Sequence, residues 1–192
     1  MIRNIRIPLA IAACAAAALI AGSACAQSSS KPATLADIVV TGEAAEKSFE
    51  KHLLRLDIAE QVAHACFDHA RENGFTVALH IVDQFGYTLY AGRMDGAQAD
   101  AVESSALKAR TALYFREPTR VWMGRSIQTP LMGQLVGQLN QFPVTGGLPI
   151  IVENQLVGAI GAGGASSDQD EECARTGLIS VLGEQPSLAS PE

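Results

Sequence analysis

Residues 80–112 read HIVDQFGYTLYAGRMDGAQADAVESSALKARTA. This run contains two strand-like segments, a turn at residues 84–86 and a helix-like segment that carries Lys108 on its face of small residues. The first strand-like segment, 76–83, is apolar on both faces, which predicts a central strand that is covered on both sides. Charged residues stand where a plain hydrophobic core would have apolar ones, and this favours a ligand-facing site.

The remainder of the chain continues this mixture of helices and strands. Apolar residues at spacings of three and four predict helices, and apolar runs bounded by turn residues predict strands. The expected helices cover 53–72, 100–115, 119–125 and 168–182, and the expected strands cover 76–83, 87–94, 148–152 and 156–160. This order predicts a single α+β domain in which helices flank an antiparallel sheet. Segment 126–142 fits either a broken helix or an apolar lid.

Polar and glycine residues at the borders of these segments predict how the helices begin. Thr119 suits the cap of the short helix, and Ser167 with Asp170 makes a capping-box-like start for the last one. The glycine-rich run 161–164 precedes that last helix directly and is expected to form a tight turn.

The first 26 residues have the features of a signal peptide. Arg3 and Arg6 precede an apolar run, and Ala24-Cys25-Ala26 fits the small-residue cleavage rule. We therefore expect export to the periplasm or the medium after cleavage near Gln27, with a lipid-modified Cys25 as the alternative. The expected organisation is a signal peptide over 1–26, a linker or extension over 27–52, a domain over 53–184 and a flexible tail over 185–192.

Acidic residues outnumber basic ones in this chain. It has 14 Lys and Arg against 20 Asp and Glu, and loss of Arg3 and Arg6 on cleavage would leave a net charge of −8. A nucleic acid partner is not expected, because phosphate binding depends on clustered basic side chains. After cleavage no membrane span is expected either, because no remaining segment has the necessary apolar length.

Cys66 and Cys173 remain after the expected cleavage. In an oxidising compartment such a pair predicts a disulfide bond. The alternative is a pair of small, buried, free cysteines, which is a common use of this residue.

Seven short motifs occur in order along the domain. They are Val82-Asp83 with Gly86, Arg93-Met94-Asp95-Gly96-Ala97, Lys108-Ala109 with Thr111-Ala112, Pro118-Thr119, Gly146-Gly147 with Pro149-Ile150, Leu156-Val157-Gly158-Ala159-Ile160-Gly161, and Asp170-Glu171 with Ala174 and Gly177. With these motifs the chain resembles the GlcG/HbpS family, also described as haem-binding or PduO C-terminal-like. The resemblance implies a profilin-like fold, homo-oligomers and, in some members, a haem or corrinoid-related ligand. Some members have an E-x-x-E pair before the lysine, but Ala106 stands three residues after Glu103 here, so no metal site is expected.

Four charged residues are candidates for ligand binding. Lys108 could anchor a carboxylate or a propionate, or it could form an internal ion pair with Asp83 or Asp95. Arg93 has the planar fork that suits carboxylate recognition, although arginine at a strand end is more often a structural pair. Asp83 is expected mainly to stabilise the turn that follows it.

Glycines and histidines supply the other candidates. Gly146, Gly147, Gly163 and Gly164 are expected at positions of close approach or positive φ, where backbone N–H groups could receive an anion. His69 and His80 are the candidate axial ligands for haem, with Met94 and Met132 as alternatives. A structural role is the more common one for each of these side chains.

These features favour an exported, homo-oligomeric protein that binds haem or a related tetrapyrrole. Segment 131–139 would form an apolar lid, and Arg93 and Lys108 would meet a glycine-lined backbone across one apolar cavity. The alternative is an acid–base enzyme of the lyase or isomerase type, acting on a small hydroxy- or oxo-acid through Lys108 and Asp83. The residues do not contain a nucleophile motif, and they leave open whether the protein is an enzyme.

Overall fold

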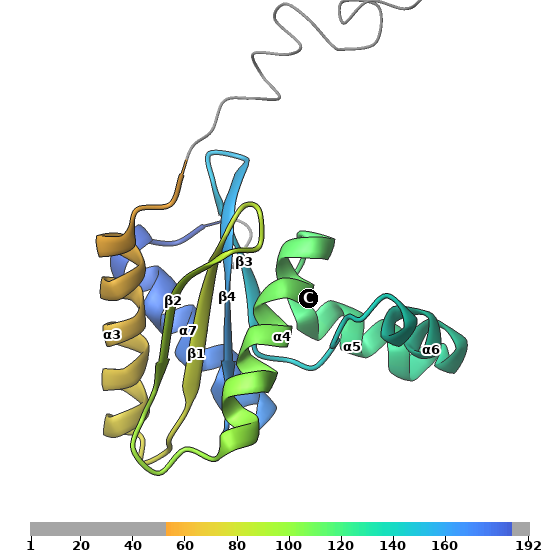
Figure 1. Cartoon of the computed structure of the whole chain (residues 1–192), viewed down its shortest axis with the longest axis horizontal. Helices are drawn as coiled ribbons and strands as arrows, with labels where there is room; N and C mark the ends of the chain where they lie inside the picture. The colour runs from red at the N-terminus through yellow and green to blue at the C-terminus, as the bar shows by residue number, and fades with distance from the viewer. Residues whose placement is uncertain (1–52, 186–192) are drawn as a thin grey trace, which may run out of the picture. The chain divides into compact units, whose positions relative to one another are not determined.

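A four-stranded antiparallel sheet with the strand order β2-β1-β4-β3 forms the centre of the computed structural model, which describes residues 53–185 (Figure 1). The strands are β1 (Ala78–Asp83), β2 (Thr88–Arg93), β3 (Gly147–Val152) and β4 (Gln155–Gly163), and the helices are α3 (Leu56–Glu72), α4 (Ala99–Phe115), α5 (Thr119–Gln128), α6 (Pro130–Gln138) and α7 (Ser167–Leu182). The expected signal peptide, the linker over 27–52 and residues 186–192 of the expected tail lie outside the described residues. Within residues 53–185 no helix combines the length and the apolar character that a membrane span requires.

The sheet consists of two hairpins that pair through their inner strands. β1 pairs with β2 and β3 pairs with β4, and the central contact joins β1 to β4 with His80 opposite Gly161. All three pairings are antiparallel, and helices cover both faces. The predicted α+β domain with a helix-flanked antiparallel sheet is therefore confirmed.

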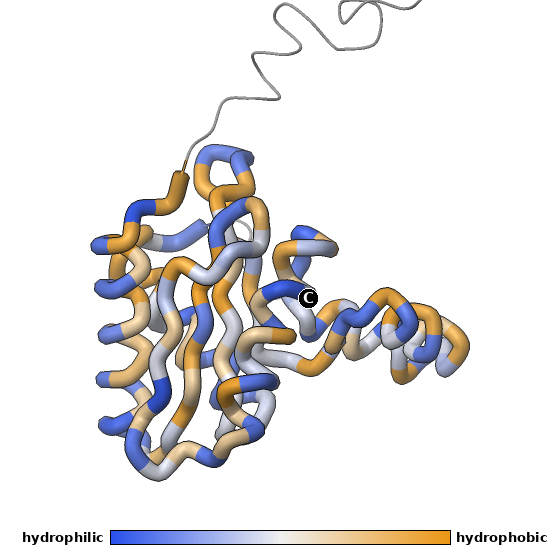
Figure 2. The backbone as a smooth tube through the Cα atoms, viewed as in Figure 1, coloured by the Kyte–Doolittle hydropathy of each residue, from blue (hydrophilic) through white to orange (hydrophobic). Residues whose placement is uncertain are grey.

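The two faces of the sheet have different cores. α3 and α7 cover one face, where large side chains such as Leu79, Ile160 and Leu178 are fully buried. The hydrophilic residues of α3 lie along its outer edge (Figure 2), as expected for a helix with one buried stripe. α4 covers the other face, where the core consists mainly of alanines and Val82. Small residues on this face let α4 lie close to the sheet.

Gly161 shows how close this approach is. A Cβ atom at Gly161 would lie 2.2 Å from the Ser105 carbonyl oxygen of α4, and one at Gly147 would lie 2.4 Å from the Lys108 carbonyl oxygen. The predicted tight turn over 161–164 is wrong in this respect, because Gly161, Ala162 and Gly163 continue β4. Only Gly164, with a φ of +116°, leaves the strand. The glycines make room for a helix rather than for a turn.

The predicted helix caps also need correction. Pro118 is the N-cap of α5, while Thr119 lies in the helix and uses its hydroxyl to accept a hydrogen bond from the Gly147 N–H at 2.9 Å. The capping box of α7 is formed by Ser166 and Gln169, one residue earlier than the sequence pattern indicated. The carboxylate of Asp170 is thereby left for another contact.

The segment that fitted either a broken helix or a lid forms the end of α5 and all of α6. Pro130 begins α6, a position where proline costs no helical hydrogen bond. The two helices form an arm that extends away from the sheet (Figure 1), and α6 packs mainly against α5 among the described elements.

A disulfide bond joins α3 to α7. Cys66 and Cys173 are both fully buried in the larger core, and their sulfur atoms are bonded. The predicted bridge is therefore confirmed, and the alternative of two free thiols is not.

Candidate functional site

A buried ion pair joins α4 to α7. Lys108 donates a hydrogen bond from Nζ to Oδ2 of Asp170 at 2.7 Å, and the two residues are 3% and 2% exposed. The prediction that Lys108 pairs with Asp83 or Asp95 is wrong, because its partner, Asp170, comes from α7. The pair can form because of Gly146 at φ +124°, where a Cβ would lie 2.8 Å from the Asp170 Cβ and 3.0 Å from Nζ.

The environment of Asp170 opposes its negative charge. Burial raises the pKa of its carboxyl group above the ordinary value, while the Lys108 ammonium and the Ala165 N–H lower it in part. That N–H donates to Oδ1 at 3.1 Å. Asp170 therefore depends on Lys108 to remain an ion inside the protein.

The ion pair lines a pocket with a volume of about 280 Å³. Its other walls come from the start of α4, from the segment that follows α6, and from the turn that contains Gly164. Phe142 and Val144 contribute to it, but segment 131–139, the expected lid, does not. Arg93 and Asp83 are not among the lining residues either. The structure thus brings Lys108 to Gly146 and Gly164, but it does not bring Arg93 or Asp83 to Lys108.

Asp83 has the structural role that the sequence indicated. Its Oδ1 accepts hydrogen bonds from the Phe85 N–H at 2.9 Å and from the Tyr87 N–H at 3.0 Å, across the turn between β1 and β2. The acid–base pair proposed for an enzyme, Asp83 with Lys108, is therefore not assembled in this pocket.

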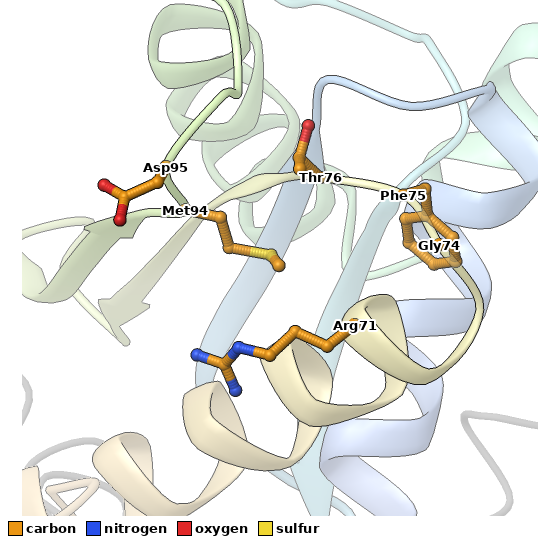
Figure 3. Close-up of a pocket in the computed structure, with 6 residues that line it drawn as sticks. All are labelled: Arg71, Gly74, Phe75, Thr76, Met94 and Asp95. Atoms are coloured by element: carbon orange, nitrogen blue, oxygen red, sulfur yellow. The ribbon is translucent and has the colours of Figure 1, made fainter.

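A second pocket, of about 400 Å³, lies between the end of α3 and the end of β2 (Figure 3). Arg71 extends along it toward Met94, Phe75 stands beside Gly74, and Asp95 lies at its outer side. Arg71 also pairs with the exposed Asp68 on its own helix. Asp95 and Met94 therefore belong to a different pocket from Lys108, and no sequence motif pointed to Arg71.

His80 lies on the β1 face that α4 covers. Its Nδ1 is 2.9 Å from the hydroxyl oxygen of Ser105, which itself donates to the Val102 carbonyl oxygen at 2.9 Å. When the Ser105 hydroxyl donates to Val102, its oxygen accepts from His80, and Nδ1 is then the protonated ring nitrogen. Nε2 keeps its lone pair and has no hydrogen-bond partner within residues 53–185. Burial, and in second place the positive charge of Arg110, lower the pKa of His80.

Basic residues lie on both sides of His80. In the register of the sheet His80 is opposite Ala91 and Ala78 is opposite Arg93, so His80, Ala91 and Arg93 share the α4 face. α4 packs mainly over β1, β4 and β3 and hardly covers β2, which leaves Ala91 and Arg93 exposed. Arg93 approaches the Ala97 carbonyl oxygen from Nη1 at 3.4 Å. Sequence reasoning found His80 and Arg93 separately but did not find Ser105 or Arg110.

His69 has a different environment. Its Nε2 is buried without a hydrogen-bond partner within residues 53–185 and lies 3.7 Å from Oε1 of Glu172 on α7. Its ring meets that of Phe75 edge to face at 5.9 Å between centroids. His69 therefore packs between helices and is a poorer candidate axial ligand than His80. No cluster of three or more His, Cys, Asp or Glu suited to a metal ion occurs in the described part of the chain.

Residues 54–179 match the family model described as "Haem degrading protein HbpS-like". The chain belongs to the GlcG/HbpS family. Two curated relatives agree with this family. The chain is 33% identical over 137 residues to an uncharacterised 15.0 kDa protein in the dhaT-dhaS intergenic region of Citrobacter freundii, covering 69% of this chain and 94% of that protein. It is 30% identical over 118 residues to protein GlcG of Escherichia coli strain K12, covering 58% and 81%.

A solved family member has the same fold. The crystal structure of a double mutant of Streptomyces reticuli HbpS aligns with a TM-score of 0.65 and 32% identity, and the alignment covers 77% of this chain and 97% of that chain. The matched residues 54–179 include the sheet, the arm and helices on both faces of the sheet.

Proposed function

We propose that this protein is an exported, homo-oligomeric binding protein for haem or a related tetrapyrrole. The haem-related description of the HbpS-like family supports the class of ligand. The signal-like start of the sequence supports export, and the disulfide between Cys66 and Cys173 suits an oxidising compartment. The single observation that carries the proposal is the geometry of His80.

The His80 imidazole has the features of an axial ligand. Haem iron is commonly held by a neutral imidazole nitrogen, and the other ring nitrogen of such a histidine usually donates to a partner that fixes the ring. In this tautomer Nδ1 donates to Ser105, and Nε2 keeps a lone pair that no group within residues 53–185 engages. The lowered pKa of His80 keeps the ring neutral at pH 7. These observations support Nε2 of His80 as the axial ligand.

The surroundings of His80 suit the rest of a haem group. Arg93 on β2 and Arg110 on α4 are exposed cations that could pair with the two propionates. Ala91 lies between His80 and the solvent-exposed edge of the sheet and presents only a methyl group. The bound group itself would supply a redox-active iron, and the residues of this chain would hold and orient it.

We expect that haemin added to the isolated protein gives a shifted Soret band that saturates at one equivalent per chain. The His80→Ala variant should lose at least about 10–100-fold in affinity, the typical cost of removing only an outer-shell partner of a metal ligand, because it loses the axial nitrogen itself. His64→Ala is the matched control, since His64 is exposed on α3. An unchanged haemin spectrum with the wild-type protein would reject the ligand, and equal affinities for the two variants would reject His80. A slow loss of the band would report haem degradation after binding.

The pH dependence of haemin binding provides a second test. Burial holds the pKa of His80 below its ordinary value of 6.5, so the ring takes up its proton with a midpoint below that pH. The affinity for haemin should therefore fall on acidification with a midpoint below pH 6.5, as the ring becomes protonated. Titrations at several pH values would measure this, and a midpoint above pH 6.5 would contradict the assigned ligand.

A further inference from the structure

The pocket beside the pair of Lys108 and Asp170 contains hydrogen-bonding groups that the fold itself does not use. A lysine ammonium has three N–H donors, and among residues 53–185 Nζ of Lys108 has one partner, Oδ2 of Asp170 at 2.7 Å. Lys108 is 3% exposed and lines the pocket, so an acceptor for its other two N–H groups comes from the pocket. A buried donor without an acceptor costs free energy, and a molecule bound in the pocket would remove that cost.

The rest of the pocket wall adds groups that donate and groups that accept. Gln98 and Asp100 line the pocket from the start of α4, and Ser167 lines it from the first residue of α7. Ser104 also lines it and donates its hydroxyl hydrogen to the Ala101 carbonyl oxygen at 3.2 Å, which leaves the hydroxyl oxygen as an acceptor. A ligand that both donates and accepts hydrogen bonds therefore suits this wall.

The charges of the pocket wall argue against an ionic ligand. Among the described residues that line the pocket, Lys108 is the only basic one, and it faces two carboxylates, those of Asp100 and Asp170. This excess of one negative charge, on a chain whose net charge is −6, opposes an incoming carboxylate or phosphate. A cation would instead meet the buried ammonium of Lys108. A neutral molecule with several hydroxyl groups meets neither difficulty.

The size of the pocket and its apolar side limit the ligand further. Phe142 and Val144, from the segment that follows α6, line the pocket and would contact the C–H groups of a ligand. A volume of about 280 Å³ corresponds to roughly nine water molecules at about 30 Å³ each. A polyol of about three to five carbon atoms has roughly six to ten non-hydrogen atoms and therefore fits this space.

We propose that the pocket beside Lys108 and Asp170 is a second ligand site, which binds a small neutral polyol. One hydroxyl oxygen of the polyol accepts from Nζ of Lys108, and another hydroxyl donates to the carboxylate of Asp100. His80 does not line this pocket, so the inference goes beyond the proposed haem site and does not depend on it. A missing Soret shift with haemin would reject the haem proposal and leave this one standing.

Titration of the ¹⁵N-labelled protein with erythritol, followed by amide chemical shifts, tests this proposal. The amides of Gly164, Ala165 and Ser167 should shift and saturate, with a dissociation constant in the millimolar range that is usual for so small a ligand. Chemical shifts are preferred to a melting temperature, because polyols stabilise proteins without binding to a site. Sodium acetate is the anionic probe and should give no saturable shift at these amides. Shifts that never saturate with erythritol, or that saturate with acetate instead, would overturn the proposal.

Variants of exposed residues locate the site without breaking the buried ion pair. Asp100→Ala should weaken erythritol binding about tenfold, because it removes a charged acceptor. Glu103→Ala is the matched control, since Glu103 is an exposed acid on the same helix that does not line the pocket. Ser167→Phe should abolish the saturable shifts, because the larger side chain fills the pocket. Equal dissociation constants for Asp100→Ala and Glu103→Ala, or wild-type affinity in Ser167→Phe, would show that erythritol does not bind here.

Discussion

Replacing Lys108 with methionine should lower the free energy of unfolding by about 3–5 kcal/mol at pH 7. Methionine keeps the length and the apolar stem of lysine but removes the ammonium group. Asp170, 2% exposed, would then be a buried carboxylate that has lost its cation and retains only the N–H of Ala165. Urea denaturation at equilibrium would measure the loss.

Two further variants show whether the buried charge of Asp170 causes the loss of stability. Arg110→Met removes an exposed cation from the same helix and should change stability by no more than about 0.5 kcal/mol. Adding Asp170→Asn to Lys108→Met should restore part of the loss, because the second change removes the uncompensated charge. A Lys108→Met protein as stable as the wild type would mean that the ion pair does not hold α4 to α7.

The pH dependence of this loss has a definite sign. Burial already raises the pKa of Asp170 above 3.8 in the folded protein, and removal of the lysine takes away the main opposing influence. An acid whose pKa is higher in the folded state than in the unfolded state destabilises the fold above that folded pKa and ceases to do so once it is protonated. The difference between Lys108→Met and wild type should therefore shrink as the pH falls toward 3.8, and a difference that grows would contradict this account.

The sheet could be predicted from the sequence because its signals are local. Alternation and turn residues within about ten positions locate each strand and each hairpin. The central position of β1 follows from the two-sided apolar character of residues 76–83, although this character does not decide that its second neighbour is β4. The helices could be located for the same reason, by their apolar stripes.

The site was harder to predict, because its contacts are distant in sequence. Lys108 and Asp170 are 62 residues apart, and nothing in the spacing of either residue shows that α4 and α7 approach each other beside Gly146. The glycines of β4 were mistaken for a turn, since a glycine needed for close helix packing looks the same in sequence as one needed for positive φ. Arg93 and Lys108 were expected in one cavity, but they lie on opposite sides of α4, one near the β2 edge and one beside α7.

Removing the disulfide should have an effect as large as breaking the ion pair. Cys66 and Cys173 are separated by 107 residues, and closing so long a loop in the unfolded chain is worth about 4.7 kcal/mol in the chain-entropy treatment, within the usual range of about 2–5 kcal/mol for lost native bridges. The Cys66→Ala/Cys173→Ala variant should therefore unfold at a clearly lower denaturant concentration than the wild type.

A reducing agent provides the control for this prediction. Dithiothreitol present during unfolding should bring the wild-type protein close to the double variant and should leave the variant itself unchanged, because the variant has no bridge between α3 and α7 to lose. Both cysteines are fully buried among apolar side chains, so replacement by alanine alone costs only a small cavity. Two results would show that the native protein lacks the bridge. A tryptic digest under non-reducing conditions would not contain the peptide pair joined through Cys66 and Cys173. Dithiothreitol would also leave the unfolding transition of the wild-type protein unshifted.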